Sequence, residues 1–393
     1  MKNIKTISTS AKPSWFTMRF DRNELAGAFG DIGTDLPLIV GVALAAKLDG
    51  ANVLIMFGIM QMLTAMRYQI PMPVQPLKAM SAIVIAQKLN GAVLYGAGLA
   101  IGVTMLFLSI TGLIDWLARV VPKSVVRGLQ FGLGIQLASL ALRDYVQSDA
   151  AAGYGLAIIA FVLTVLFIGN RRFPAALFVI LLGVIYAFVF KLDLSTVVHG
   201  VGFNLPQFHQ PQWSDIVTGF LLLTVPQIPL SLGNSVLATR QLAEDLFPEK
   251  QLTVRQISFT YSLMNLISPW FGGVPTCHGS GGMAGHYTFG GRTGGSVFIY
   301  GVFYLGLGLF FGKGFDSLVE VFPLPILGVL LLFEGLAMMM LVRDLASSKT
   351  EFPIVLMVGL MAGGLPYGYV VGLVVGTALA YLTRKGFTGL ARL

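Results

Sequence analysis

Residues 272–295 read GGVPTCHGSGGMAGHYTFGGRTGG, a glycine-rich and polar stretch inside a chain that is otherwise strongly apolar. The apolar run within it is too short to cross a bilayer, because a helical crossing takes about 20 residues. Irregular backbone at membrane depth is tolerated only where it is buried in protein or lines a wet cavity. We therefore expect extended backbone at Pro275 and the next four residues, then a short helix capped by Gly279 or Ser280. Its first amide N–H groups would face the cavity and attract an anion.

The composition is that of a polytopic membrane protein. Of the 393 residues, 55% are hydrophobic and 11% are charged, whereas soluble domains carry about 25% charged residues. The basic N-terminus, with Lys2, Lys5 and Lys12, is not followed by a signal-peptide cleavage pattern, so we expect the first apolar segment to stay in the membrane. The net charge of +8 comes from basic residues at segment ends, where orientation signals belong. We expect no nucleic-acid partner.

The chain lacks the patterns of common catalytic and metal sites. Its one cysteine, Cys277, excludes an intramolecular disulfide and a multi-cysteine metal site. None of the four histidines belongs to an H-E-x-x-H motif. The string HGSGG, residues 278–282, has histidine two positions before the serine, where a nucleophile elbow requires glycine. The sequence therefore predicts neither an enzyme nor a cofactor or metal site.

Apolar segments separated by polar or basic turns fill most of the chain, and we predict an all-α protein with fourteen of them. A basic tail, residues 1–23, precedes the segments. A polar connection, 191–213, separates a first repeat, 24–190, from a second repeat, 214–385. The third and tenth segments are too short to span a membrane alone. The segments are 24–46, 51–70, 71–87, 92–113, 122–142, 153–168, 174–190, 216–237, 256–271, 272–295, 295–311, 324–341, 352–363 and 367–382.

The two halves align as copies of each other, with the two short segments at the same place in each copy. Four landmarks stay in register: Pro73 with Pro275, Pro122 with Pro323, Arg143-Asp144 with Arg343-Asp344, and Gly30-Asp31 with Gly233-Asn234. Each copy holds seven segments, an odd number, so the second copy enters the membrane from the opposite side. The sequence therefore predicts inverted repeats, with both short helices meeting at mid-membrane.

The basic residues give the expected orientation. With a cytoplasmic N-terminus, most of the 26 Lys and Arg residues fall at inside ends, among them Arg67 and Arg255. Positive charge concentrates on the cytoplasmic side of membrane proteins. We therefore expect a multi-pass protein of the cytoplasmic (inner) membrane with both termini inside and the connection 191–213 outside.

The chain resembles the molybdate transporter family, relatives of the sulfate permeases, in three motifs: GAFGDIGTDLP (27–37), PVQPLKA (73–79) and VPTCHGSGGMAGHYTFGGRTG (274–294). The resemblance implies a seven-plus-seven inverted-repeat fold. It also implies a core domain of segments 1–4 and 8–11 beside a gate domain of segments 5–7 and 12–14. The chain departs from the family at Thr288, where arginine is frequent. It also ends soon after Arg384, so we expect no C-terminal regulatory domain of the sulfate-permease kind.

The predicted function is secondary-active import of a tetrahedral oxyanion, molybdate first, by alternating access, with proton coupling left open. A sulfate or other anion permease, a nucleobase permease of the same fold and an anion channel remain alternatives. Neither short helix offers a carboxylate to a neutral ring, which favours an anion over a nucleobase. Inverted repeats favour alternating access over a channel. The expected partners are the oxyanion and the lipid bilayer, and a homodimer is left open.

The predicted site joins the starts of the two short helices to the kinked eighth segment. Its amide and hydroxyl groups can donate hydrogen bonds to an oxyanion, and its glycines let backbone approach it closely. The alternative is that the glycines only allow helices to cross. The site residues are Gln75, Pro76, Lys78, Gln227, Ser231, Asn234, Thr276, Cys277, His278, Gly279, Ser280, Gly281 and Gly282.

Four charged residues have open roles. Lys78 is either a counter-charge to the anion or a side chain that reaches the interface. Asp31 and Asp35 lie on one helix face and are candidates for proton coupling, for pairing with Lys78 or for purely structural bonds. Glu334 is either a proton site on the gate or a buried acid with its own partner.

The eighth segment carries two prolines that break its hydrogen bonds, and we prefer Asn234 there because it aligns with Asp31. His278 adjoins the short helix and either contacts the ligand or acts as scaffold. Cys277 is expected to be a packing residue.

Overall fold

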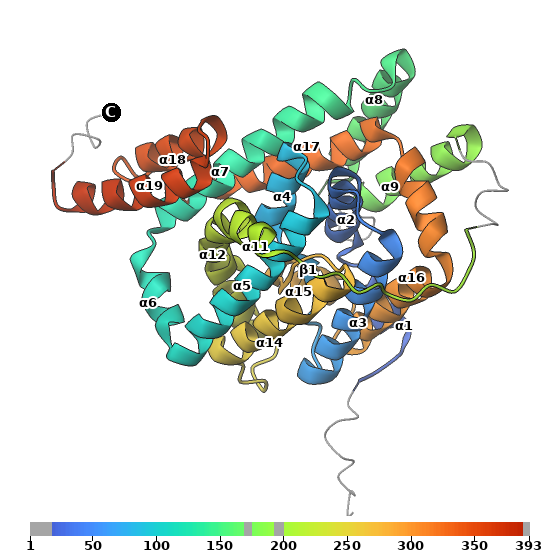
Figure 1. The fold of residues 1–393 in the computed structure, drawn as a ribbon, viewed down its shortest axis with the longest axis horizontal. Helices are drawn as coiled ribbons and strands as arrows, with labels where there is room; N and C mark the ends of the chain where they lie inside the picture. Colours follow the sequence, from blue (N-terminus) through green and yellow to red (C-terminus); the bar gives the residue numbers. More distant parts are fainter. Residues whose placement is uncertain (1–17, 169–174, 192–199, 388–393) are drawn as a thin grey trace, which may run out of the picture.

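The computed structural model describes residues 18–168, 175–191 and 200–387. The predicted basic tail, 1–23, therefore lies mostly outside the described residues, as does part of the connection 191–213. The described part is almost entirely helical, and helices from both halves of the chain lie side by side (Figure 1). This is the arrangement expected of a polytopic protein.

The first half contains α1 to α9 and the strand β1. Its bounds are α1 Arg22–Ala28, α2 Ile32–Ala46, α3 Gly50–Tyr68, β1 Val74–Pro76, α4 Lys78–Gln87, α5 Gly91–Thr111, α6 Leu113–Val120, α7 Lys123–Leu140, α8 Ala150–Phe167 and α9 Ala175–Tyr186. Two π-helical turns extend α7 and α9, namely η1 Ala141–Tyr145 and η2 Ala187–Lys191.

The second half contains α11 to α19 and the strand β2. Its helices and strand are α11 Trp213–Gly219, α12 Val225–Leu230, α13 Ala238–Leu246, α14 Val254–Ile267, β2 Thr276–His278, α15 Ser280–Thr288, α16 Gly295–Val321, α17 Leu324–Met340, α18 Phe352–Gly364 and α19 Gly368–Arg384. Four further turns join them, namely η3 Phe220–Thr224, η4 Ser231–Leu237, η5 Ser268–Phe271 and η6 Leu341–Leu345.

Each predicted apolar segment contains helix, but three details of the prediction are wrong. The first segment is interrupted between α1 and α2, and Asp31 is the residue directly before α2. The eighth begins at Trp213, inside the predicted connection, and runs to Leu246 through two π-helical turns. The all-α class is also incomplete, since each short helix follows a strand. Eight described helices are long and apolar enough to span a membrane, so the fourteen crossings remain a prediction.

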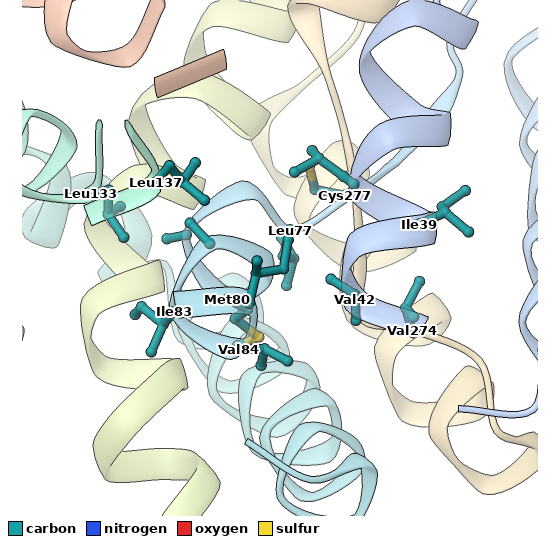
Figure 2. Close-up of a cluster of buried hydrophobic side chains, with 14 of the residues drawn as sticks. Ile39, Val42, Leu77, Met80, Ile83, Val84, Leu133, Leu137, Val274 and Cys277 are labelled. Atoms are coloured by element: carbon teal, nitrogen blue, oxygen red, sulfur yellow. The ribbon is translucent and has the colours of Figure 1, made fainter. Parts of the chain in front are cut away.

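The helices pack in two sets. In one, α3 packs along α16, and α5 packs on α11 and α14. In the other, α7 packs on α17, α18 and α19, and α8 packs on α9 and α17. The short helix α4 lies between the sets, because it contacts α2 on one side and α7 on the other (Figure 2).

A cluster of buried side chains surrounds α4 and shields it from lipid (Figure 2). Leu77, just before α4, and Met80, Ile83 and Val84 within it all have less than 2% of their surface exposed. Van der Waals packing of this kind holds membrane helices together, because lipid is as apolar as the side chains. The cluster is completed by Ile39 and Val42 from α2, Leu133 and Leu137 from α7, and Val274 and Cys277 from the segment around β2.

The strands β1 and β2 form an antiparallel pair in which Gln75 lies opposite Cys277. The outer edge of each strand bonds to a side-chain amide instead of a third strand. Gln61 of α3 donates to the Val74 carbonyl (2.7 Å) and accepts from the Val74 amide (2.8 Å). Asn265 of α14 makes the same two bonds to Thr276, at 2.7 and 2.9 Å. Both edges are thereby satisfied, as buried backbone requires.

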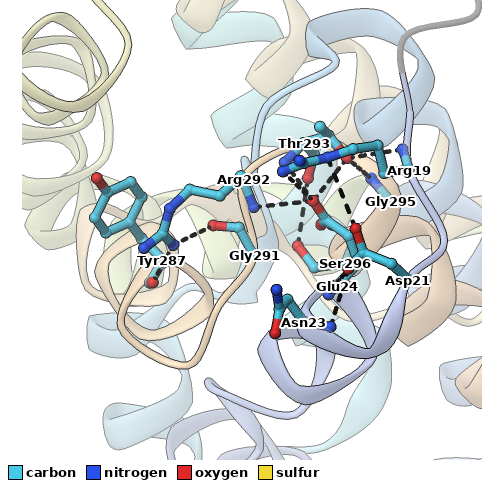
Figure 3. A network of polar contacts seen from close by, with 10 residues as sticks. All are labelled: Arg19, Asp21, Asn23, Glu24, Tyr287, Gly291, Arg292, Thr293, Gly295 and Ser296. Carbon is cyan, nitrogen blue, oxygen red and sulfur yellow. Dashed lines mark hydrogen bonds and ion pairs between the residues drawn. The ribbon is translucent and has the colours of Figure 1, made fainter.

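The start of α16 is fixed by Glu24 of α1, whose side chain is fully buried. Its carboxylate accepts hydrogen bonds from the amides of Arg292 (3.1 Å), Thr293 (2.9 Å) and Ser296 (3.0 Å), as Figure 3 shows. A carboxylate at a helix N-terminus is stabilised by the helix dipole and by charge-assisted bonds. Arg292 in turn lies over the Tyr287 ring at 3.7 Å. The loop after α15 is thus held to the first helix.

We predict that Gln61→Leu and Asn265→Leu each lower stability markedly. Each change leaves a buried N–H and a buried C=O without a partner, and each such group costs about 1–3 kcal/mol. Thermal unfolding in detergent should show both variants melting well below the unmodified protein. Gln241→Leu is the control, because Gln241 lies on an exposed helix face, where its side chain bonds Asp245. Equal melting temperatures for all three variants would contradict the role of Gln61 and Asn265 in bonding the strand edges.

Candidate functional site

A cavity of about 270 Å³ opens where the two short helices begin. Its walls come from both halves of the chain, and they include α7 and α17 of the second packing set. The lining residues are Gln75, Lys78, Gln130, Gln227, Leu230, Ser235, Cys277, Gly279, Ser280, Gly281, Glu334, Ala337, Met338 and Leu341. Eight of these belong to the predicted site or its coupling candidates. The structure therefore brings these eight residues together around one cavity.

Both short helices present uncapped starts to this cavity. The residues before them, Leu77 and Gly279, are extended and make no side-chain cap. The first amides of a helix have no partner inside the helix. One of these amides has a partner from another helix: the Met80 amide of α4 donates to Gln227 Oε1 at 3.1 Å. The remaining first-turn amides, including those of Ser280 and Gly281, give this wall a positive potential.

The glycines before and within α15 differ in what they allow. A Cβ on Gly279 would overlap the Gln75 side chain, and one on Gly282 would overlap Asp31 Oδ2. A Cβ on Gly281 would meet nothing within 4 Å. Gly279 and Gly282 are thus required for close packing, whereas the backbone of Gly281 borders open space. Close packing accounts for the glycines at positions 279 and 282, but it does not account for Gly281.

Lys78 pairs with Glu334, at 2.9 Å between Nζ and Oε1. The pair joins α4 to α17, and both side chains line the cavity. Lys78 keeps 38% of its side chain exposed and Glu334 20%. Lys78 therefore faces the cavity, and its direct hydrogen-bonding partner is Glu334 instead of Asp31 or Asp35. Glu334 was predicted to be either a proton site or a buried acid with its own partner, and this ion pair fits the second role.

The two aspartates lie behind the cavity wall and are buried. Asp31 Oδ2 accepts a hydrogen bond from Gln75 Nε2 at 2.6 Å. Asp35 Oδ2 accepts one from the Tyr300 hydroxyl at 3.5 Å, and Tyr300 bonds Tyr304 at 3.0 Å. Within the described residues, Asp35 Oδ1 has no hydrogen-bond partner. Asp31 thus orients a cavity side chain, whereas Asp35 belongs to a buried tyrosine chain.

The sequence matches a family over more than half of its length. The family described as "Molybdate transporter of MFS superfamily" matches residues 23–137 and 219–338. "Molybdate transporter 1" of Arabidopsis thaliana is 35% identical over 398 residues, which cover 89% of this chain and 86% of that protein. This chain belongs to the molybdate transporter family. The resemblance seen in the three motifs is confirmed.

Two further relatives of this molybdate transporter family member carry the same description. "Molybdate transporter 2" of A. thaliana is 34% identical, with 84% of this chain and 81% of that protein covered. "Molybdate transporter 1" of Chlamydomonas reinhardtii is 26% identical, with 94% and 93% covered. The family and these relatives are transporters, so the chain is a multi-pass membrane transporter and not an enzyme.

Solved structures with the same fold are also transporters by their titles. The transmembrane domain of BicA, a cyanobacterium bicarbonate transporter, has a TM-score of 0.67 at 18% identity and covers 91% of this chain and 96% of its own. Murine Slc26a9, titled an anion transporter in the inward-facing state, has a TM-score of 0.69 at 15% identity and covers 97% and 73%. At these identities the likeness shows the fold alone.

Several residues predicted for the site of this family member lie outside the cavity lining. His278 is buried, and its Nε2 bonds Thr260 Oγ1 at 2.7 Å while its ring packs edge-on against Tyr68. This geometry is that of a scaffold residue. The Thr276 backbone is held by Asn265. Pro76, Ser231 and Gly282 also lie outside the lining, and the side chain of Asn234 lies outside the described residues.

Ser231 acts through a neighbour. Its hydroxyl accepts from Gln227 Nε2 at 3.0 Å and bonds Tyr261 at 2.8 Å. This series of hydrogen bonds holds Gln227 in the position from which its Oε1 reaches the Met80 amide. Cys277, which was predicted as a site residue and expected to serve in packing, lines the cavity.

Sequence reasoning missed the polar residues Gln130 and Ser235, which complete the lining. Gln130 Oε1 accepts from Arg127 at 2.9 Å, and Arg127 pairs with Asp344 at 2.7 Å. A signal was available for Gln130, because it is one of two glutamines, with Gln136, in an apolar segment. Ser235 adjoins the residue that the repeat alignment selected, so its position carried a weaker signal.

Proposed function

We propose that this protein is a secondary-active transporter that imports a tetrahedral oxyanion, with molybdate as the first candidate. The observation that carries the proposal is the pair of uncapped helix starts, α4 and α15, on the wall of one cavity beside Lys78. Helix N-termini bind anions through free amides and the helix dipole. Relatives named as molybdate transporters support the choice of substrate.

The cavity offers donors of three kinds to such an anion. Backbone amides of Ser280 and Gly281 lie at one helix start, the Ser280 hydroxyl lies beside them, and the Lys78 ammonium lies at the other start. A dianion that leaves water must exchange its hydration shell for donors of this type. The volume of about 270 Å³ also leaves room for several waters, each of which occupies about 30 Å³ in the liquid.

A nucleobase permease and an anion transporter would require different side chains in the cavity wall. A nucleobase permease would need a free carboxylate to bind a neutral ring, and the carboxylate in the lining, Glu334, is paired with Lys78. This favours an anion. Sulfate and molybdate have the same charge and shape, so the donors just described serve either one.

Alternating access would move the proposed core, segments 1–4 and 8–11, against the proposed gate, segments 5–7 and 12–14. The two packing sets support this division. Two ion pairs cross between the proposed domains: Lys78 with Glu334 at 2.9 Å, and Lys88 with Asp144 at 3.5 Å. Both must separate or exchange partners if α4 slides past the gate. An arriving oxyanion would compete with Glu334 for Lys78, which links binding to that motion.

Asp35 is the coupling candidate that we favour over Asp31. Its carboxyl group is buried, accepts a long hydrogen bond from Tyr300 and lies beside the Tyr300–Tyr304 pair. An ionisable residue at this depth marks a proton or substrate pathway by default.

We further propose the membrane orientation that the basic residues indicate, with both termini in the cytoplasm and the protein in the inner membrane.

We predict that Gly281→Val abolishes molybdate binding in protein that still folds. A Cβ at this position would meet no protein atom within 4 Å, and Gly281 lines the cavity. The new side chain should therefore displace the anion and leave stability nearly unchanged. Gly306→Val, which also meets nothing within 4 Å, is the control in α16. Ser280→Ala removes one hydrogen bond to a charged group and should weaken affinity roughly ten- to a hundred-fold.

Calorimetric titration and a melting curve on the same preparation measure these effects. Folded Gly281→Val protein that binds molybdate normally would refute the site. Equal loss of affinity in Gly306→Val would show that the effect is not local.

A second prediction concerns coupling. In proteoliposomes, an imposed pH gradient, acid outside, should drive molybdate accumulation, which a channel cannot sustain. Asp35→Asn should lose this accumulation but retain exchange of internal for external molybdate, because exchange needs no net proton movement. Glu244→Gln, on an exposed helix face, is the control. Accumulation that ignores the gradient, or that survives in Asp35→Asn, would rule out Asp35 as the coupling group.

A further inference from the structure

A second hollow lies between α3, the end of α5 and α14, away from the cavity just described. It is a groove of about 530 Å³. One end carries two arginines, Arg67 and Arg255, and the remainder is mostly apolar. The oxyanion site does not account for it, because the two hollows have no lining residue in common.

The charged end has no counter-charge of its own. Arg67 ends α3 and Arg255 begins α14, and both are exposed. Neither guanidinium forms an ion pair with a carboxylate in the described part of the chain. Arg67 instead lies over the Tyr68 ring at 5.6 Å. Two free guanidinium groups at one end of a groove suit a phosphate oxyanion.

The apolar end has the length of one lipid leaflet. Phe259, Leu263 and Ile267 recur every four residues on α14 and are 50%, 46% and 39% exposed. From Arg255 to Ile267 the helix covers about 18 Å, close to the roughly 15 Å depth of half a hydrocarbon core. Leu63 faces the same groove from α3 and is 49% exposed.

We propose that this groove binds an anionic phospholipid, with its phosphate on Arg67 and Arg255 and one acyl chain along Phe259, Leu263 and Ile267. The charge complementarity commits the groove to an anionic headgroup, and the apolar stripe commits it to a lipid rather than to a free anion. The expected orientation places both arginines on the cytoplasmic side, where anionic lipids give the membrane surface its negative potential.

Thr260 connects the groove to the oxyanion site. It lines the groove, and its hydroxyl bonds both Tyr68 (2.5 Å) and His278 Nε2 (2.7 Å). His278 ends β2, directly before the start of α15. A lipid that fills the groove therefore steadies the α3–α14 pair that carries the scaffold of the site. This step predicts stabilisation of the protein by the lipid.

The test titrates purified protein in detergent with phosphatidylglycerol, phosphatidylcholine or inorganic phosphate. Native mass spectrometry measures bound lipid, and melting curves measure stabilisation. Phosphatidylglycerol should bind at least about tenfold more tightly than phosphatidylcholine, because its headgroup is a net anion, whereas the choline ammonium of phosphatidylcholine offsets the phosphate charge that the two arginines would meet. Arg67→Gln/Arg255→Gln should lose this preference. The matched double variant Arg22→Gln/Arg343→Gln, also at exposed positions, should keep it.

Three results would overturn the proposal. The first is an unchanged lipid preference in Arg67→Gln/Arg255→Gln, or in either single variant if the double variant does not fold. The second is equal binding of the two lipids by the unmodified protein. The third is stabilisation by inorganic phosphate that equals that of phosphatidylglycerol, which would indicate a free-anion site. Leu263→Trp, which fills the apolar end and keeps both arginines, should also weaken lipid binding.

Discussion

The structure depends on how irregular backbone is satisfied deep inside a membrane protein. The two strands bond each other, and Gln61 and Asn265 bond their outer edges. Beside these paired strands, the first turns of α4 and α15 present amide N–H groups to the cavity. An anion is the partner that such donors accept most readily. The same need to satisfy backbone thus stabilises the crossing and creates the site.

The charged and polar groups near the cavity are also paired with other groups of the protein. Lys78 has Glu334, Asp31 has Gln75, and the Met80 amide has Gln227. Because an unpaired charge is costly away from water, each of these pairs is stable until a competing partner arrives. An oxyanion can take the place of Glu334, and the pair it breaks is one that joins the two proposed domains. In the proposed mechanism, binding and domain movement are linked through the Lys78–Glu334 ion pair.

Much of this could be predicted from the sequence, because the signals are local. The glycine-rich stretch predicted a break in the membrane helix, Pro275 predicted extended backbone, and the motifs predicted the family. What could not be predicted depends on contacts between distant residues. The partner of Lys78 is 256 positions away, and no local pattern indicates it. His278 has every sequence property of a ligand, yet its ring faces Thr260 and Tyr68, because the direction of a strand side chain depends on register.

The most direct test of the account is the position of the bound anion. Crystals grown with tungstate, a heavier tetrahedral dianion, give an anomalous difference map at the tungsten absorption edge. The account predicts the strongest peak in the cavity between the starts of α4 and α15, within contact of the Ser280 and Gly281 amides. A strongest peak elsewhere, such as beside Arg67 and Arg255, would contradict the assignment of the oxyanion site.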